Sequence, residues 1–236
     1  MFKYLEQVDS TNSYCESHFK DLADKSVVYT YNQTNGRGRF NRKWIKLGTD
    51  NVYMSIVLKP SILYQKVYSN LTQYTSLVLA ELLSSNYDVK PVIKWPNDVL
   101  VNGRKIAGIL AEAVYNSGKL EGIIIGIGVN LNTKKELLSE INQPATALNI
   151  ESGKEIDKNN FLKNFYEKFF INYDKFLNFG FKSIKTQYEQ YCSFLNKTIK
   201  IHISSDSEIS GKAEKISDDG ALIIDGTKYY TGDVEI

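Results

Sequence analysis

Residues 98–110 read Asp-Val-Leu-Val-Asn-Gly-Arg-Lys-Ile-Ala-Gly-Ile-Leu, so that two apolar runs flank the dipeptide Asn102-Gly103. Asn-Gly between two such runs is a strong sequence signature of a β-hairpin with a two-residue turn. Outward from this hairpin, strand-like runs occupy about residues 2–8, 26–31, 51–58 and 122–130, and helix-spaced apolar residues occupy 68–84 and 157–179. This pattern predicts an α/β (α+β) fold with a mixed sheet flanked by helices.

The hairpin predicts which of its charged side chains share a face. With a two-residue turn, Asp98 lies diagonally from Lys105 at about 7 Å, and Arg104 points to the opposite face. We favour Lys105 as the functional cation. The alternative is an ordinary surface pair of Asp98 and Lys105. The neighbouring Pro96 favours extended backbone before it, and Asn97-Asp98 offers oxygen ligands suited to Mg²⁺.

Arginine is confined to the hairpin and to one glycine-rich segment. Of 29 basic residues, 25 are lysine, and all four arginines and both tryptophans lie in residues 36–44 and 94–105. A guanidinium offers a planar fork of donors that matches phosphate and carboxylate. Gly36 and Gly38 allow backbone amides to approach an anion closely. Residues 36–44 therefore indicate a phosphate-handling loop. An RNA-binding Arg-Gly segment is the alternative, but such segments recur and this one occurs once.

The composition is that of an ordinary soluble globular protein. The chain has 236 residues, 42% hydrophobic and 24% charged, with a net charge of +2. Dispersed charge of this size gives no overall attraction to nucleic acid. The apolar run 122–131 is too short to span a bilayer, and the N-terminus shows no signal or transit peptide, so a cytoplasmic location is expected. Cys15, Cys192, His18 and His202 are isolated, so neither a disulfide nor a zinc site is assigned.

The texture of the sequence changes near residue 195. Short alternating runs at 198–203, 210–216, 221–225 and 228–231 are separated by Asp-Gly turns. Such a run of short strands predicts a small β-barrel. We therefore expect a main domain over residues 1–190 and a barrel domain over residues 191–236.

Six motifs, taken together in their order and spacing, resemble the biotin-protein ligases. They are Asp9-Ser10-Thr11-Asn12, Gln33-Thr34-Asn35-Gly36-Arg37-Gly38-Arg39, Arg42-Lys43-Trp44, Lys94-Trp95-Pro96-Asn97-Asp98, Lys105-Ile106-Ala107-Gly108-Ile109-Leu110 and Gly126-Ile127-Gly128-Val129-Asn130. The resemblance implies a class II synthetase-like catalytic domain with a C-terminal SH3-like barrel. It also implies a two-step reaction. The biotin carboxylate attacks the α-phosphate of ATP to give biotinyl-5′-AMP and pyrophosphate, and a carrier lysine then takes the biotinyl group and releases AMP.

The same resemblance implies roles for individual residues. Arg39 is expected to contact the adenylate, and Lys105 the carboxylate and phosphate oxygens, so these two are the predicted catalytic residues. The predicted substrate-binding residues are Ser10, Thr11 and Gln33 on biotin, Arg37 and Arg42 on pyrophosphate or in loop closure, Gly108 in the pocket wall, and Asn12, Gly36, Gly38, Trp44, Asn97, Asp98 and Asn130 as further motif members.

Two departures from the family pattern bear on function. The family loop typically runs Gly-Arg-Gly-Arg-Arg-Gly-Arg, and here Phe40-Asn41 replace the later Arg-Gly pair. Asn41 tolerates a positive φ and is expected to stand where glycine would. The ligase motifs begin at Asp9, so we expect a monofunctional enzyme with no N-terminal DNA-binding domain.

The expected substrates are biotin and ATP with Mg²⁺, and the expected partner is a biotin carboxyl carrier protein such as that of acetyl-CoA carboxylase. No tightly bound cofactor, no DNA and no membrane contact are expected, and a homodimer stays open. Two alternatives are a lipoate or octanoyl transferase of related fold and a non-enzymatic nucleotide-binding module. No segment matches the lipoate-type motif, and a pure binding module has no need of Lys105.

Overall fold

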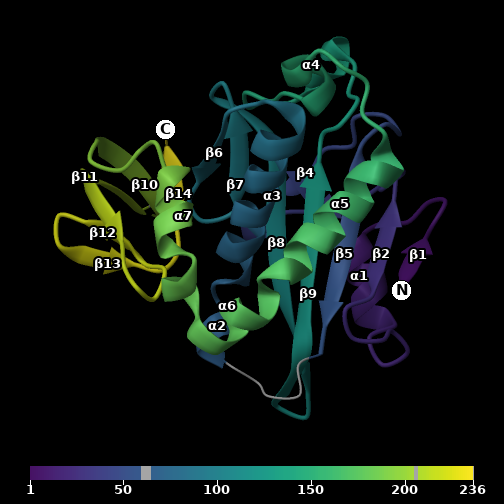
Figure 1. The fold of residues 1–236 in the computed structure, drawn as a ribbon, viewed down its shortest axis with the longest axis horizontal. Coiled ribbons are helices and arrows are strands. Elements are labelled where there is room, and N and C mark those ends of the chain that lie inside the picture. The colour runs from purple at the N-terminus through teal and green to yellow at the C-terminus, as the bar shows by residue number, and fades with distance from the viewer. Residues whose placement is uncertain (60–64, 205–206, 236) are drawn as a thin grey trace. The chain divides into compact units, whose positions relative to one another are not determined.

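The computed structural model describes residues 1–59, 65–204 and 207–235 (Figure 1). Contacts divide the chain into two compact units, and each unit is discontinuous in sequence. The first unit comprises residues 1–65 and 104–163, and the second comprises residues 66–103 and 164–236.

The first unit is built on a mixed sheet. Its strands follow the order β1-β2-β5-β9-β8 and lie side by side in Figure 1. β1 is parallel to β2, and the remaining pairs are antiparallel. The bounds are β1 Phe2–Tyr4, β2 Val27–Thr30, β5 Val52–Leu58, β8 Arg104–Asn116 and β9 Lys119–Val129.

Helix α1 (Thr11–Ser17) packs against this sheet. The Ser10 hydroxyl caps the helix by accepting a hydrogen bond from the backbone N–H of Ser13. The apolar side chains of α1 and the segment after it, Cys15, Phe19 and Leu22, are buried against Val28, Val57 and Ile124 of the sheet. Smaller elements of this unit are β3 (Gly36–Arg37), β4 (Lys43–Trp44), α4 (Leu148–Ser152) and the 3₁₀ turns Arg39–Asn41 and Lys135–Glu140.

Two tight turns bound strand β8. Asn102 and Gly103 have φ of 50° and 72°, and positive φ at both central residues is typical of the predicted two-residue hairpin turn. At the other end, Ser117 and Gly118 have φ of 49° and 76°, and the sequence analysis missed this turn. β8 therefore extends six residues beyond Leu110, where the predicted strand ended.

The second unit buries three aromatic side chains from the segment 157–179 that was predicted to be helical. Phe165, Phe169 and Phe176 are fully buried, and the Tyr74 ring lies 5.1 Å from that of Phe169 and 4.6 Å from that of Phe176. The predicted single helix over 157–179 is broken at Asn172. The elements outside the C-terminal sheet are α2 (Gln65–Tyr68), α3 (Leu71–Tyr87), α5 (Lys158–Ile171), α6 (Tyr173–Phe179), α7 (Lys185–Gln190), the 3₁₀ turn Phe181–Ser183 and the antiparallel pair β6 (Pro91–Lys94) and β7 (Asp98–Val101). α2 and α5 each begin in the first unit.

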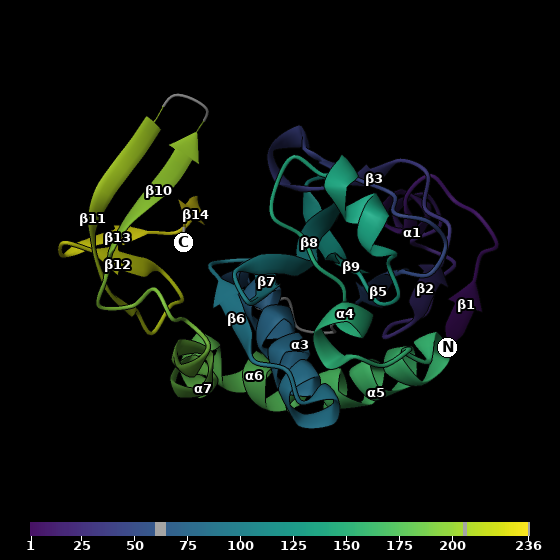
Figure 2. The same ribbon diagram turned by 90° about the horizontal axis from the view of Figure 1, so that it is seen from above.

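The C-terminal part forms a separate five-stranded antiparallel sheet, as predicted for a small β domain (Figure 2). Its order is β13-β12-β11-β10-β14. The strands are β10 Thr198–Ser204, β11 Ser207–Ile216, β12 Leu222–Ile224, β13 Thr227–Tyr229 and β14 Asp233–Glu235, of which β14 was not predicted. The turn before β12 is tied to the rest of the unit, because the Gly220 carbonyl accepts hydrogen bonds from Trp95 Nε1 at 3.2 Å and from Gln73 Nε2 at 2.9 Å.

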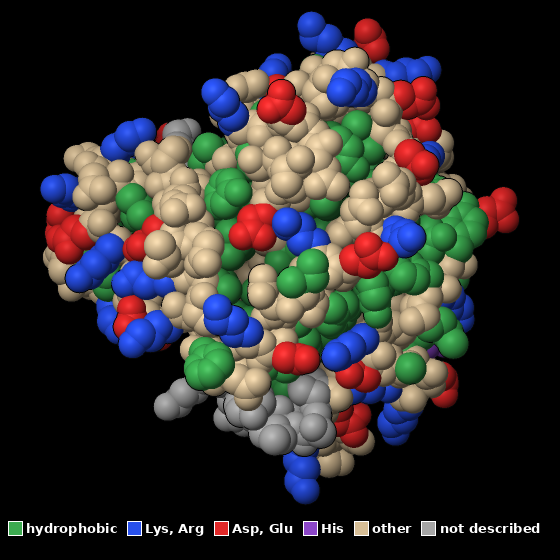
Figure 3. All heavy atoms as spheres, in the orientation of Figure 1, with side chains coloured by type: hydrophobic (Ala, Val, Ile, Leu, Met, Phe, Trp, Pro, Cys, Tyr) green, Lys and Arg blue, Asp and Glu red, His purple; other side chains and the backbone are tan. Residues whose placement is uncertain are grey.

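On the face shown in Figure 3, Lys and Arg side chains are interspersed with Asp and Glu, as expected from the small net charge. No helix among the described ranges is long and apolar enough to cross a membrane.

Candidate active site

Two glycines of the central strands make room for an indole ring. Gly108 of β8 is the register partner of Gly128 of β9. A Cβ atom would lie 2.7 Å from Trp44 Cζ3 if built at Gly108, and 2.8 Å from Trp44 Cε2 if built at Gly128. Side chains at these positions would displace the ring. The two glycines therefore form a flat floor, and Trp44 of β4 lies on it.

Lys105 brings its cation to the same place. Its Nζ lies 5.4 Å from the centroid of the Trp44 ring, and a Cβ at Gly108 would lie 3.2 Å from that Nζ. The backbone of Lys105 is held on both sides, since its N–H donates to Pro144 and its carbonyl accepts from Thr146, each at 2.9 Å. A rigid backbone thus presents the ammonium over the aromatic face.

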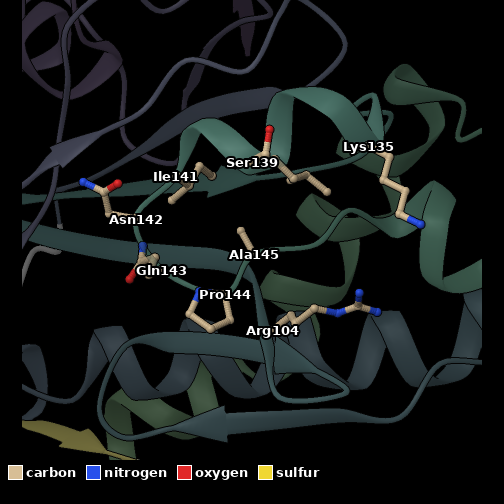
Figure 4. A pocket seen from close by; sticks show the side chains of 9 residues that line it. Arg104, Lys135, Ser139, Ile141, Asn142, Gln143, Pro144 and Ala145 are labelled. Carbon is tan, nitrogen blue, oxygen red and sulfur yellow. The ribbon is translucent and has the colours of Figure 1, made fainter.

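Arg104 points elsewhere, as the hairpin geometry predicted. Its guanidinium pairs with Glu151 at 2.7 Å, and the Glu151 side chain is almost wholly buried. Figure 4 shows Arg104 beside a pocket of about 490 Å³, with its guanidinium and the Lys135 ammonium extending to the same side. The rest of the lining is Leu138, Ser139, Ile141, Asn142, Gln143, Pro144 and Ala145.

Buried polar side chains gather beside Gly126, which precedes Gly128 by two residues on β9. Gln33 Oε1 accepts from the Thr11 N–H at 2.9 Å and lies 3.3 Å from the Thr11 hydroxyl. Ser55 Oγ lies 2.7 Å from Thr11 Oγ1 and 2.6 Å from Asn12 Oδ1. A Cβ at Gly126 would overlap the Asn12 carboxamide, so only glycine leaves space for this cluster. Of these residues, sequence reasoning missed Ser55.

Glu112 is the second residue that sequence reasoning missed. Its Oε2 accepts hydrogen bonds from Asn12 Nδ2 at 2.7 Å and from Arg37 at 2.9 Å. Glu112 follows Gly108 by four residues on β8, so the two share one face of the strand. That period-two alternation was the available indication, but the strand had been ended at Leu110.

The glycine-rich loop is a narrow two-stranded ribbon. Gly36 pairs with Trp44 in register, and the Gly38 N–H donates to the Arg42 carbonyl at 2.8 Å. At its tip the guanidinium carbons of Arg39 and Arg42 lie 4.8 and 5.9 Å from the centroid of the half-exposed Phe40 ring. The left-handed conformation expected at Asn41 is found at Phe40, with φ 54° and ψ 39°.

Asn130 directly follows β9 and forms hydrogen bonds through both its side chain and its backbone. Its Nδ2 donates to the Thr146 carbonyl at 3.0 Å, its N–H donates to Ile106, and its carbonyl accepts from Leu148. These bonds tie the end of β9 to the segment that also holds the Lys105 backbone. A contact between Asn130 and substrate stays a prediction.

Asn97 and Asp98 belong to the second unit, at the turn between β6 and β7. Asn97 Nδ2 donates to Asp98 Oδ1 at 2.9 Å, and Asp98 is buried. Within the described ranges, no three His, Cys, Asp or Glu side chains gather in a way that could hold a metal ion.

The thiol of Cys15 is buried beside Ser55 of the polar cluster. Burial raises the pKa of the Cys15 thiol to about 12. Since only the thiolate is a nucleophile, Cys15 stays protonated at neutral pH and takes no covalent role.

Known proteins are similar in sequence to this chain over nearly its whole length. Residues 4–130 match the model of the biotin/lipoate A/B protein ligase family. The bifunctional ligase/repressor BirA of Bacillus spizizenii is 31% identical over 239 residues, covering 99% of this chain and 73% of that protein. The biotin--[acetyl-CoA-carboxylase] ligase of Paracoccus denitrificans is 30% identical, covering 94% of this chain and 93% of that protein.

Solved structures agree on the fold. The biotin protein ligase from Aquifex aeolicus in complex with biotin and ATP superimposes with a TM-score of 0.85 at 26% identity, covering 99% of this chain and 97% of that one. The family predicted from the six motifs is therefore confirmed. This chain belongs to the biotin/lipoate A/B protein ligase family.

Proposed function

We propose that this protein is an ATP-dependent biotin-protein ligase, which activates biotin as biotinyl-5′-AMP and transfers the biotinyl group to a lysine of a carrier protein. One observation carries the proposal. The site combines a flat floor with a buried polar cluster at Thr11 and Gln33. Gly108 and Gly128 form the floor, the indole of Trp44 lies on it, and the Lys105 cation lies beside that indole.

The geometry suits a ligand with a flat polar head and an anionic tail. The ureido ring of biotin offers two N–H donors and one carbonyl acceptor, and Gln33 and the Thr11 hydroxyl offer both donors and acceptors. The valerate chain of biotin is apolar and fits the glycine floor beside Trp44. Its carboxylate would then reach the end of the floor where Lys105 lies, and an ammonium attracts a carboxylate.

In the first step the carboxylate oxygen forms a bond to the α-phosphorus of ATP, and the bond to the leaving pyrophosphate breaks. Negative charge grows on the phosphate oxygens, so fixed cations are the main catalytic device. Lys105 acts from the rigid strand β8. Arg39 acts from the tip of the glycine-rich loop, where its planar fork can contact two oxygens at once. Arg37 and Arg42 would bind pyrophosphate or close the loop.

In the second step the neutral amine of a carrier lysine attacks the anhydride carbonyl, and AMP leaves. Water would hydrolyse the same anhydride, so the intermediate needs shielding between the steps. The loop over residues 36–44, which is anchored at its base and carries cations at its tip, is suited to close over the bound adenylate.

The partners follow from this chemistry. The acceptor we propose is the biotin carboxyl carrier subunit of acetyl-CoA carboxylase, the enzyme after which the Paracoccus denitrificans relative is named. Mg²⁺ enters as the complex with ATP, and the oxygen atoms of Asn97 and Asp98 are of the kind that Mg²⁺ prefers. The proposal needs no tightly bound cofactor, DNA, membrane or second copy of the chain, and it places the reaction in the cytoplasm, where ATP is available.

Calorimetric titration of the purified protein with biotin and, in parallel, with lipoate tests the substrate class. We expect saturable binding of biotin and none of lipoate at the same concentrations. Binding of lipoate in preference to biotin would transfer the assignment to the lipoate branch of the same family.

A further inference from the structure

A continuous chain of hydrogen-bonded polar groups connects the two ends of the short segment 33–37. It starts at Gln33 Oε1, which accepts from the N–H of Thr11. Thr11 Oγ1 contacts Ser55 Oγ, and Ser55 Oγ contacts Asn12 Oδ1. From Asn12 the chain continues to Glu112. It therefore crosses α1, β5 and β8 before it returns to the loop.

The return to the loop is an ion pair. Arg37 donates from Nη2 to Glu112 Oε2 at 2.9 Å, the same oxygen that accepts from Asn12 at 2.7 Å. Arg37 is the second residue of β3, and Gln33 precedes it by four residues. Gln33 and Arg37 lie at the base of the glycine-rich loop, and they are the two ends of this hydrogen-bonded chain.

The donors and acceptors in this chain have a fixed direction. Ser55 has a single hydroxyl proton, and Asn12 Oδ1 can only accept, so Ser55 donates to Asn12. The Nδ2 group of Asn12 is consequently turned toward β8, where it donates to Glu112 Oε2 and, at 3.3 Å, to the Leu110 carbonyl. A reversed carboxamide would place its oxygen against the Glu112 carboxylate. The negative charge of Glu112 therefore selects this orientation.

We propose that Glu112 is a positioning residue that couples the polar groups around Thr11 and Gln33 to the glycine-rich loop. It does so by holding the Asn12 carboxamide in one orientation and by fixing Arg37 at the base of the loop. The inference rests on the proposed function in one respect, that biotin is the ligand that contacts Thr11 and Gln33. Because coupling between two sites is reciprocal, a ligand there would order the loop, and an ordered loop would strengthen its binding.

The test compares Glu112→Gln with a matched control. Glutamine keeps the size of the side chain and an acceptor for Asn12, and it removes the charge that pairs with Arg37. Glu121→Gln on β9 is the control, because the Glu121 carboxylate accepts a hydrogen bond from another asparagine, Asn116, at 2.7 Å outside the site. Both variants lose one carboxylate charge from the same sheet.

Amide hydrogen exchange is measured across residues 36–44 without ligand and with biotin, together with calorimetric biotin affinity and steady-state kinetics. In Glu112→Gln we expect faster amide exchange across residues 36–44 without ligand. We also expect the biotin dissociation constant to rise about fivefold, because the free energy of an exposed ion pair corresponds to a change in affinity of about this size. The KM for biotin should rise in parallel while kcat at saturating biotin stays within about twofold. A merely structural role would lower the melting temperature without this division between KM and kcat.

A double-mutant cycle with Arg37→Gln separates the ion pair from other effects of each change. If the two residues act through their contact, the double variant should bind biotin no more weakly than the poorer single variant. Strictly additive losses, or exchange and affinity in Glu112→Gln equal to those of Glu121→Gln, would overturn the proposal. Should Glu112→Gln fail to fold, Arg37→Gln alone tests the same contact from its exposed side. If the wild type binds no biotin, the proposed function fails, while ligand-free exchange still decides whether Glu112 fixes the loop.

Discussion

At the residue scale, the motif residues could be predicted and their supports could not. Hairpin geometry predicted that Lys105 and Arg104 lie on opposite faces, and the structure places the two side chains in different surroundings. Ser55 escaped notice because it lies within an ordinary apolar strand pattern, and Glu112 because the predicted strand ended at Leu110. Their importance arises from register, which brings Ser55 to α1 and Glu112 to Arg37. Register between distant strands is not written in any local pattern.

Arg39 provides a test of why arginine is used so sparingly in this chain. If its planar fork binds two phosphate oxygens, Arg39→Lys should be nearly as defective as Arg39→Ala, because an ammonium cannot make two parallel hydrogen bonds. The expected symptom is faster release of biotinyl-5′-AMP, measured by filter retention of labelled intermediate. Retention restored by lysine would mean that charge alone is sufficient.

Cys15 predicts a specific dependence of stability on pH. Burial raises the pKa of its thiol from 9.0 to about 12 in the folded protein. Its contribution is therefore present below pH 9 and is lost as pH rises, because the unfolded thiol ionises while the folded one stays protonated. Between pH 8 and 10, wild type should lose about 1.4 kcal/mol more unfolding free energy than Cys15→Ala in urea titrations. Equal losses in both proteins would place the thiol in contact with solvent.

At the element scale, the arginines and glycines of the glycine-rich loop could be predicted to handle phosphate, but the two-stranded ribbon that carries them could not be predicted. The sequence indicated a phosphate-handling loop over residues 36–44, and the structure pairs Gly36 with Trp44 in it. Phe40 adopts the left-handed conformation in place of Asn41 and lies against two guanidinium groups. We propose that the Phe40 ring takes over part of the loop closure that an arginine at this position would otherwise provide.

We expect ligands to slow amide exchange in this loop. Biotin, and more strongly a non-hydrolysable biotinyl-adenylate analogue, should slow exchange across Gly36 to Trp44 and leave the sheet from β10 to β14 largely unchanged. Mass spectrometry of deuterium uptake with and without ligand measures both regions at once. Slow exchange that is present without ligand and insensitive to it would rule out closure.

The turn at Gly220 predicts a large loss of stability on substitution. Gly220 has φ of +85°, and a Cβ there would overlap Asn70 Nδ2 and approach Gln73 Oε1 at 2.7 Å. Gly226 has a similar φ of +76° with open space around it, so Gly226→Ala controls for backbone strain. Gly220→Ala should be destabilised by at least about 2 kcal/mol more than this control in urea unfolding. Equal stabilities would show that the turn is not packed as described.

At the scale of the whole molecule, the periodicity of apolar residues could predict the class of the fold but not the division of the chain into two compact units. Strand and helix runs indicated a mixed sheet flanked by helices and a small C-terminal β domain, and both are present. The two compact units each combine distant segments, as when Tyr74 packs on Phe169 and Phe176. Contacts between segments so far apart in sequence cannot be predicted from a local change in the pattern of residues. The boundary between residues 190 and 191 stays a prediction.

The central claim is that Lys105 drives adenylate formation in a biotin-dependent reaction, and one measurement tests it most directly. Biotin-dependent exchange of labelled pyrophosphate into ATP is compared in wild type, Lys105→Ala and Arg104→Gln. Arg104→Gln is the matched control, because it removes the adjacent cation, which pairs with Glu151 instead. We predict robust exchange in wild type and in the control, and a loss on the order of 10²-fold in Lys105→Ala with the fold intact. Exchange near the wild-type rate in Lys105→Ala, or exchange that does not depend on biotin, would contradict the account.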